Sequence, residues 1–153
     1  MKKLTLLTIL FCCCLGFVKQ AQAQENYTEG PVWVINYYRT KPGQFDEYMK
    51  FLRANFAKTV AKQKQAGILV DAKVLLNPTV SAPDDWDVAI AYLYSDYARL
   101  NFNQSTDDQL QKIAAEISGE KNKERRDTKL DSTRFPLRDH IRTKILREVM
   151  LRP

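Results

Sequence analysis

Three charged residues, Asp71, Lys73 and Glu148, occupy strand-like segments in which their side chains could do chemistry. Asp71 and Lys73 alternate with apolar residues in Ile68–Leu76, and Glu148 does so in Lys144–Leu151. A carboxylate enclosed in an apolar cavity has a raised pKa and can act as a general base. The same residues could instead form a salt bridge between strands or subunits, since ionisable groups of this kind are often structural. Asp71 and Glu148 are therefore candidate catalytic bases, and the structural alternative stays open.

A further set of strand residues could line a ligand pocket. Aromatic side chains suit a flat apolar ligand, although they more often pack in a core or an interface. Asn36 stands among valine, isoleucine and tyrosine, and a buried amide needs a partner, which could be a ligand, a water molecule or a neighbouring side chain. The candidate pocket residues are Asn36, Tyr38, Lys73, Ala89, Ala91 and Met150.

Other common chemistries lack their residues. His140 is the only histidine, so a metal centre built on several histidines is excluded. It stands in the charged segment 138–142, which is typical of a polar surface. The chain has no GxSxG nucleophile motif, no P-loop and no Rossmann glycine pattern. We therefore expect no metal and no other cofactor.

Residues 1–23 have the features of a bacterial secretory signal peptide. Lys2 and Lys3 precede an apolar run, 4–18, that is shorter than the ~20 residues of a membrane span. Ala21-Gln22-Ala23 follows as a cleavage site, and we expect cleavage after Ala23. A retained anchor helix and a lipoprotein modified at Cys12 are the alternatives. The sequence thus predicts a protein that is exported to the periplasm or secreted, with no stable membrane span once the signal is removed.

Removal of the signal peptide changes the bulk properties of the chain. All three cysteines lie within it, so the exported protein would have neither disulfides nor a thiolate nucleophile. Loss of Lys2, Lys3 and Lys19 lowers the formal net charge from +6 to +3. This small positive charge, on an exported protein, argues against nucleic-acid binding.

Hydrophobic periodicity after residue 31 predicts the order β-α-β-β-α-β. A mobile arm, 24–31, precedes a single domain, 32–153. The expected strands are 32–40, 68–76, 86–94 and 144–151. The first helix follows Pro42 and ends before a left-handed Gly67. The second helical region begins near Ser95, breaks at 101–105 and restarts at Thr106 in a capping box with Gln109. We expect 120–127 to be a solvated helix end or loop, and 128–143 to be irregular.

This order predicts a ferredoxin-like α+β domain, in which helices cover one face of a four-stranded antiparallel sheet. The expected strands carry apolar residues on both faces. An exposed apolar sheet face usually marks an interface. We therefore expect a homodimer in which two sheets face each other. If Val70, Ala72 and Val74 pack on the helices, Asp71 and Lys73 point toward the dimer cavity.

The chain resembles the dimeric α/β-barrel superfamily, which includes NIPSNAP-like, EthD-like and antibiotic-biosynthesis-monooxygenase-like proteins. The resemblance covers most of 32–151 and lies in the strand VWVINYYRT, the turn Lys41-Pro42-Gly43, the following helix, and the segments Gly67-Ile68-Leu69 and Trp86-Asp87-Val88. It implies a homodimer with a pocket between each sheet and its covering elements. Because a histidine is often the axial ligand in haem-binding members, it also makes His140 a haem-ligand candidate.

Three functions are consistent with these features, because the superfamily fold hosts unrelated activities. The first is binding of a small, partly apolar ligand in a sheet-lined pocket. The second is a cofactor-independent monooxygenase or isomerase that uses Asp71 or Glu148 as its base. The third is a structural or assembly role in which the apolar sheet faces serve self-association alone.

Overall fold

The computed structural model describes residues 26–82 and 84–152, so the predicted signal peptide lies outside the described residues. Residues Glu29–Met150 form one compact unit. The elements, in chain order, are β1 (Tyr27–Thr40), α2 (Phe45–Gln65), β2 (Asp71–Leu76), β3 (Val88–Tyr94), the 3₁₀ helix η1 (Tyr97–Leu100), α3 (Gln104–Ser118), α4 (Lys123–Arg134) and β4 (Arg138–Leu151). The chain is thus an α+β protein, as the sequence predicts.

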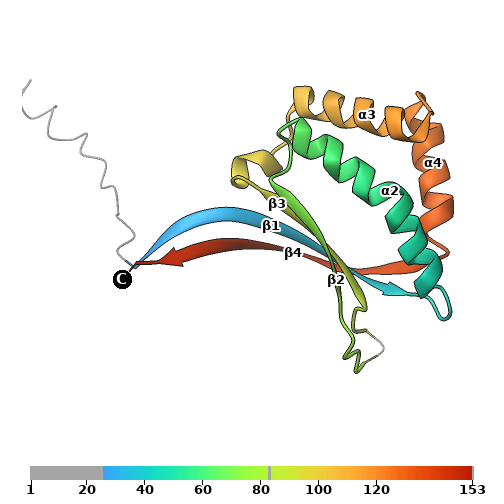
Figure 1. Ribbon diagram of the computed structural model, residues 1–153, viewed down its shortest axis with the longest axis horizontal. Coiled ribbons are helices and arrows are strands. Elements are labelled where there is room, and N and C mark those ends of the chain that lie inside the picture. The colour runs from blue at the N-terminus through green and yellow to red at the C-terminus, as the bar shows by residue number, and fades with distance from the viewer. Residues whose placement is uncertain (1–25, 83, 153) are drawn as a thin grey trace, which may run out of the picture. The chain divides into compact units, whose positions relative to one another are not determined.

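The strands form one antiparallel sheet in the order β2-β3-β1-β4. β3 is central and pairs with both β1 and β2, so that Ile90 lies between Asn36 of β1 and Val74 of β2. Figure 1 shows β1, in blue, beside β4, in red, although these strands are far apart in the sequence. The two edges of the sheet are therefore β2 and β4.

Local sequence explains the bounds of α2. Asp46 and Glu47 lie in its first turn, and Lys62 and Lys64 lie in its last turn, so both ends carry charges that suit the helix dipole. The helix ends before Gly67, whose φ of +68° is accessible to glycine at little steric cost. This terminus is where the sequence places it.

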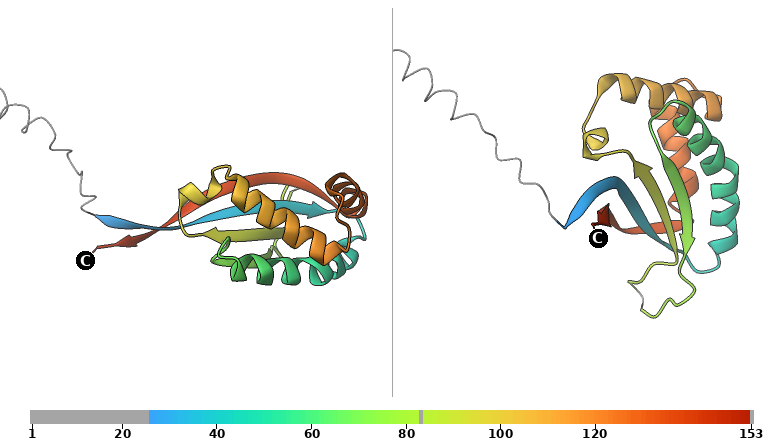
Figure 2. Two further views of the ribbon diagram at one scale, coloured as in Figure 1. Left: turned by 90° about the horizontal axis from the view of Figure 1, so that it is seen from above. Right: turned by 60° about the vertical axis from the view of Figure 1, so that its left-hand side comes forward.

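The core lies between α2 and one face of the sheet. Tyr48 and Leu52 of α2 pack against Val88 and Ile90 of β3, and Val74 of β2 joins them. Figure 2 shows α2, α3 and α4 on the same side of the sheet. Val74 therefore faces the helices, which meets the condition stated for this strand, and alternation places Asp71 and Lys73 on the opposite, open face.

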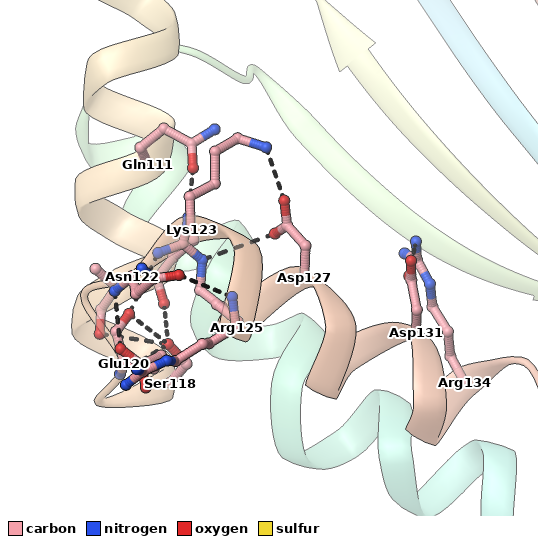
Figure 3. Close-up of polar contacts among 12 residues, drawn as sticks. Gln111, Ser118, Glu120, Asn122, Lys123, Arg125, Asp127, Asp131 and Arg134 are labelled. Carbon is pink, nitrogen blue, oxygen red and sulfur yellow. Dashed lines mark hydrogen bonds and ion pairs between the residues drawn. The ribbon is translucent and has the colours of Figure 1, made fainter.

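The C-terminal third differs from the sequence-based expectation. The sequence predicts a solvated helix end or loop over 120–127 and irregular chain over 128–143, whereas Lys123–Arg134 form helix α4 and β4 begins at Arg138 rather than at 144. α4 has no apolar stripe, and its one buried residue is charged, Arg126. Its guanidinium donates to the Glu120 carbonyl and to Gln111 of α3. Figure 3 shows this polar corner between α3 and α4.

Polar residues at the start and along the surface of α4 could have predicted the helix. The Asn122 side chain caps it by accepting a hydrogen bond from the Arg125 backbone N–H at 2.9 Å. Lys123 pairs with Asp127 one turn later at 2.7 Å, and Asp131 pairs with Arg134 at 2.5 Å. Pairs at this spacing support helices that lack an apolar face.

Other boundaries shift by a few residues. β1 begins at Tyr27, so five residues of the segment expected to be an arm belong to a strand. α3 begins at Gln104, because Asn103 rather than Thr106 is its cap. β2 begins at Asp71 and β3 at Val88, which is later than expected in both cases. Within the described part of the chain, no helix is both long and apolar enough to cross a membrane.

Candidate functional site

A cavity of about 310 Å³ lies where the end of α2, strand β3, η1 and the start of α3 meet. Its volume is at the lower end of the range for small-ligand sites, ~300–1,000 Å³. Apolar groups line much of the wall, and the polar groups among them come from different elements. The lining residues are Gln63, Ile68, Tyr92, Tyr94, Arg99, Leu100, Asn101, Phe102, Asn103, Thr106, Asp107 and Leu110.

Two side-chain caps fix the segment that forms one wall of the cavity. Asp96 accepts a hydrogen bond from the Arg99 backbone N–H at 3.2 Å and starts η1. Asn103 accepts one from the Thr106 N–H at 3.0 Å and starts α3. Phe102 lies between the two caps and is 81% exposed. The cavity therefore has an apolar side chain at its rim that is not part of the core.

Two tyrosines of β3 supply buried polar groups. Burial raises the pKa of Tyr92 to about 12, and burial also raises the pKa of Tyr94. Both hydroxyls are therefore neutral at physiological pH and can donate or accept a hydrogen bond. Tyr92 also packs against Phe56 of α2, with the rings tilted by 58° and their centroids 6.0 Å apart, which holds its ring in place. The cavity thus offers neutral hydrogen-bonding groups on a rigid strand.

A second, wider hollow lies at the turn between β1 and α2, and three of its charged groups, Lys41, Asp87 and Asp139, already have partners. Asp87 accepts hydrogen bonds from the backbone N–H and the hydroxyl of Thr40. Lys41 and Asp139, which also line this hollow, form an ion pair at 3.6 Å. The cavity beside α3 is therefore the better candidate site.

On the open face of the sheet, the structure brings Lys73 and Glu148 to the same tryptophan. The indole N–H of Trp33 donates to Oε1 of Glu148, and the Lys73 ammonium lies 5.1 Å from the centroid of the Trp33 ring. Lys73 is directly opposite Ala91 in the sheet, so its side chain crosses β3 over a small residue. This arrangement links β2, β1 and β4 through Trp33, by a hydrogen bond and a cation–π contact rather than by a salt bridge between the two charges.

Asp71 does not join this group. Its carboxylate pairs with Lys64 at the end of α2, at 3.0 Å. The hydrogen bond from Lys64 and that from the Ala72 backbone lower the pKa of Asp71. The raised pKa expected of a buried general base is therefore not found, because this carboxylate lies at the start of an edge strand rather than in an apolar cavity.

The predicted pocket residues fall on both faces of the sheet. Ala89 and Ala91 are buried on the open face beneath larger neighbours, and Met150 is 64% exposed. Asn36 and Tyr38 lie on the helix side, since they are opposite Ile90 and Val88 of β3. None of these residues, nor Lys73, lines the cavity beside α3. Strand alternation predicted which residues share a face but not where a cavity would form.

His140 and Asn36 share one hydrogen-bond partner, Thr143. Thr143 donates to the Asn36 side-chain oxygen at 2.8 Å and lies 3.0 Å from Nε2 of His140. The His140 ring also packs against Tyr38, with centroids 5.4 Å apart. His140 and Thr143 thus share a face, whereas residues three positions apart in a regular strand point to opposite faces, so the alternation of β4 is interrupted there. His140 lines neither hollow.

A cluster around Tyr48 was not predicted as a polar site. Tyr48 is fully buried, and its hydroxyl has no hydrogen-bond partner among the described residues. Burial raises its pKa, which the Arg138 charge only partly opposes. The Arg138 guanidinium lies 3.5 Å from the centroid of Tyr38 and 5.3 Å from that of Tyr48. Tyr48 appears in the sequence only as an apolar helix position, which hides its unpaired hydroxyl.

Within residues 26–82 and 84–152, no group of three or more histidine, cysteine or acidic side chains could hold a metal ion. Comparison with protein families, with curated proteins and with solved structures gives no match. The site must therefore be interpreted from its own geometry.

Proposed function

We propose that this protein binds a small, partly apolar ligand in the cavity between α2, β3, η1 and α3. The observation that carries the proposal is the cavity itself, about 310 Å³, with neutral tyrosine hydroxyls set in an apolar wall. Ligand sites commonly combine an apolar lining with a few polar groups that fix orientation. Arg99 and the two tyrosines are the groups that would orient a ligand here.

We further propose a ferredoxin-like arrangement, export of the chain, and a homodimer that uses the open sheet face. The strand order β2-β3-β1-β4, with helices on one side, supports the ferredoxin-like assignment. The exposed Leu75, at 41%, together with Trp33 and Tyr37, supports self-association through the open face. The features of residues 1–23 support export. Amino-terminal sequencing of the protein from its native host tests the last point, and a start at Gln24 is the expected result.

The enzyme alternative lacks a supporting observation. A general base needs a raised pKa in a site from which water is excluded, whereas the pKa of Asp71 is lowered by its bond to Lys64. Glu148 is held by Trp33 on the open face, away from the cavity. Asp71→Asn should therefore leave ligand binding unchanged.

Native mass spectrometry of the protein purified from its native host tests ligand binding. A bound species that survives purification gives the ligand mass, and binding of the fluorophore 1-anilinonaphthalene-8-sulfonate gives a second measurement. Leu110→Trp fills the cavity and should reduce probe affinity about tenfold or more. Leu130→Trp is the matched control, because it makes the same change on α4, outside the cavity. Equal probe affinity in the two variants would contradict the proposal.

A further inference from the structure

The outer edge of β4 is a candidate surface for pairing with another chain. β4 has 14 residues and lies at the end of the sheet, so in the described part of the chain it pairs with β1 alone. Figure 1 shows β4 beside β1, with its other edge uncovered by a strand. Long edge strands present unpaired backbone groups that can pair with another chain, and proteins usually shorten, cover or interrupt them. β4 has no proline between residues 138 and 151.

Apolar side chains are exposed on both faces of this strand. Ile145 is 50% exposed, Leu146 46% and Val149 48%. Neighbouring residues of a strand point to opposite faces, so no single layer packed on the sheet could cover both Ile145 and Leu146. A further strand added at the edge would contact both.

The C-terminal end of β4 lies where the sheet narrows to two strands. The register of β1 with β3 ends at Val32, and Gly30 lies beyond it, against Glu148 of β4. From there on, β1 and β4 form a ribbon of two strands. Such ribbons are marginally stable in water, and a third strand stabilises them.

We propose that β4 pairs antiparallel with β4 of a second copy of this chain, so that two sheets continue as one across a two-fold axis at Leu146. This contact is separate from the ligand cavity, and it joins the backbone edges of two β4 strands rather than two stacked sheet faces, although Glu148 and Leu146 lie on the open-face side of the strand. It would be an isologous interface, in which the same edge of each copy meets the other.

The charge pattern selects this register. With the axis at Leu146, Lys144 faces Glu148 of the second copy, and this pair occurs twice. Among the described residues Lys144 has no ion pair, and Glu148 uses only Oε1 for its bond to Trp33, which leaves Oε2 for a second donor. Opposite charges placed directly across two strands are stabilising, and like charges are destabilising.

The neighbouring registers are less favourable. An axis at Arg147 would place two arginines directly opposite each other, and it would compete with the bond of Arg147 to Glu29. An axis at Ile145 would extend the pairing into His140–Thr143, where the alternation of β4 is interrupted. A ladder centred on Leu146 uses the regular part of the strand.

Charge reversal tests the pairing in the full-length chain. Lys144→Glu alone and Glu148→Lys alone should each raise the dimer dissociation constant about tenfold, by analytical ultracentrifugation. An equimolar mixture of the two variants should recover wild-type affinity, because each altered residue then faces its opposite charge. Lys58→Glu, which makes the same change on α2 away from the edge, should have no effect.

A cysteine at the axis gives a geometric test. The chain with Cys12, Cys13 and Cys14 replaced by serine serves as the background. Leu146→Cys should oxidise to a covalent dimer, since residues directly opposite in antiparallel strands are about 4.5–5.5 Å apart at Cα, within disulfide range. Leu75→Cys, on the open face, is the comparison. Three results would each overturn the proposal: a monomeric wild type, a Lys144→Glu variant that dimerises as the wild type does, or cross-linking through Leu75→Cys alone. None of these results concerns ligand binding in the cavity.

Discussion

The indole of Trp33 on β1 donates a hydrogen bond to Glu148 on β4, 115 residues further along the chain. The same ring lies under the ammonium of Lys73, which reaches it from β2 across Ala91. One tryptophan thus contacts side chains from both edge strands of the sheet. Two of the charged residues that could have served catalysis are instead tied to an aromatic ring on the open face.

The bond between Trp33 and Glu148 should contribute measurably to stability. Trp33→Phe keeps an aromatic ring but removes the N–H donor, and it should lower the free energy of unfolding by about 1 kcal/mol, as measured by urea denaturation. Glu148→Gln keeps an acceptor oxygen and should cost less. A Trp33→Phe variant as stable as the wild type would show that this bond contributes nothing.

The buried hydroxyl of Tyr48 should lower the stability of the folded protein, so its removal should not be harmful. Because this hydroxyl has no partner among the described residues, its burial carries a desolvation cost without a compensating hydrogen bond. Tyr48→Phe should therefore preserve or raise the free energy of unfolding, by up to about 1 kcal/mol. Tyr48→Leu, which removes the ring, should lower it by about 2 kcal/mol or more. Marked destabilisation by Tyr48→Phe would indicate that a bound water or ligand satisfies the hydroxyl.

The raised pKa of Tyr92 predicts a loss of stability at alkaline pH. Its pKa is raised by burial from 10.0 to about 12 in the folded protein. Between these two pH values the unfolded chain loses the Tyr92 proton more readily than the folded chain, so stability is full below pH 10 and falls as pH rises to about 12. The loss from this residue should be at most about 3 kcal/mol, since its pKa rises by about two and a pKa difference of one corresponds to about 1.4 kcal/mol.

Chemical denaturation at a series of pH values measures this effect. Tyr92→Phe should show a shallower fall in stability than the wild type. Tyr97→Phe, at an exposed position, should show the same fall as the wild type. Identical pH profiles for the wild type and Tyr92→Phe would contradict the prediction.

Arg126 should anchor α4. Its guanidinium is buried and donates to the Glu120 carbonyl and the Gln111 side chain at the corner that Figure 3 shows. Arg126→Met keeps the length of the side chain but leaves both acceptors unpaired, and it should lower the free energy of unfolding by about 1–3 kcal/mol. Amide hydrogen exchange should accelerate most in α4. The exposed neighbour Arg125 is the control, and Arg125→Met should change stability by no more than about 0.5 kcal/mol.

Local sequence determined those elements whose buried residues are apolar. The stripe containing Tyr48 and Leu52 predicted α2, and the alternation around Val74 predicted which residues of β2 share a face. Gly67 marked the end of α2 because a left-handed residue there is a local requirement. α4 escaped prediction because Arg126, its one buried residue, satisfies its charge through Gln111 and Glu120, and no pattern of apolar residues records such contacts.

By itself, then, the sequence determined the α+β class, the antiparallel strands and the grouping of Lys73 with Ala89 and Ala91 on one face, because these follow from periodicities of two and 3.6 residues. Only the tertiary structure decided what each polar group contacts. It paired Asp71 with Lys64, and it formed the cavity from Tyr92, Arg99 and residues of α2 and α3. The reason is physical: a pKa or a cavity depends on distances between segments that are far apart in the chain, which local patterning does not specify.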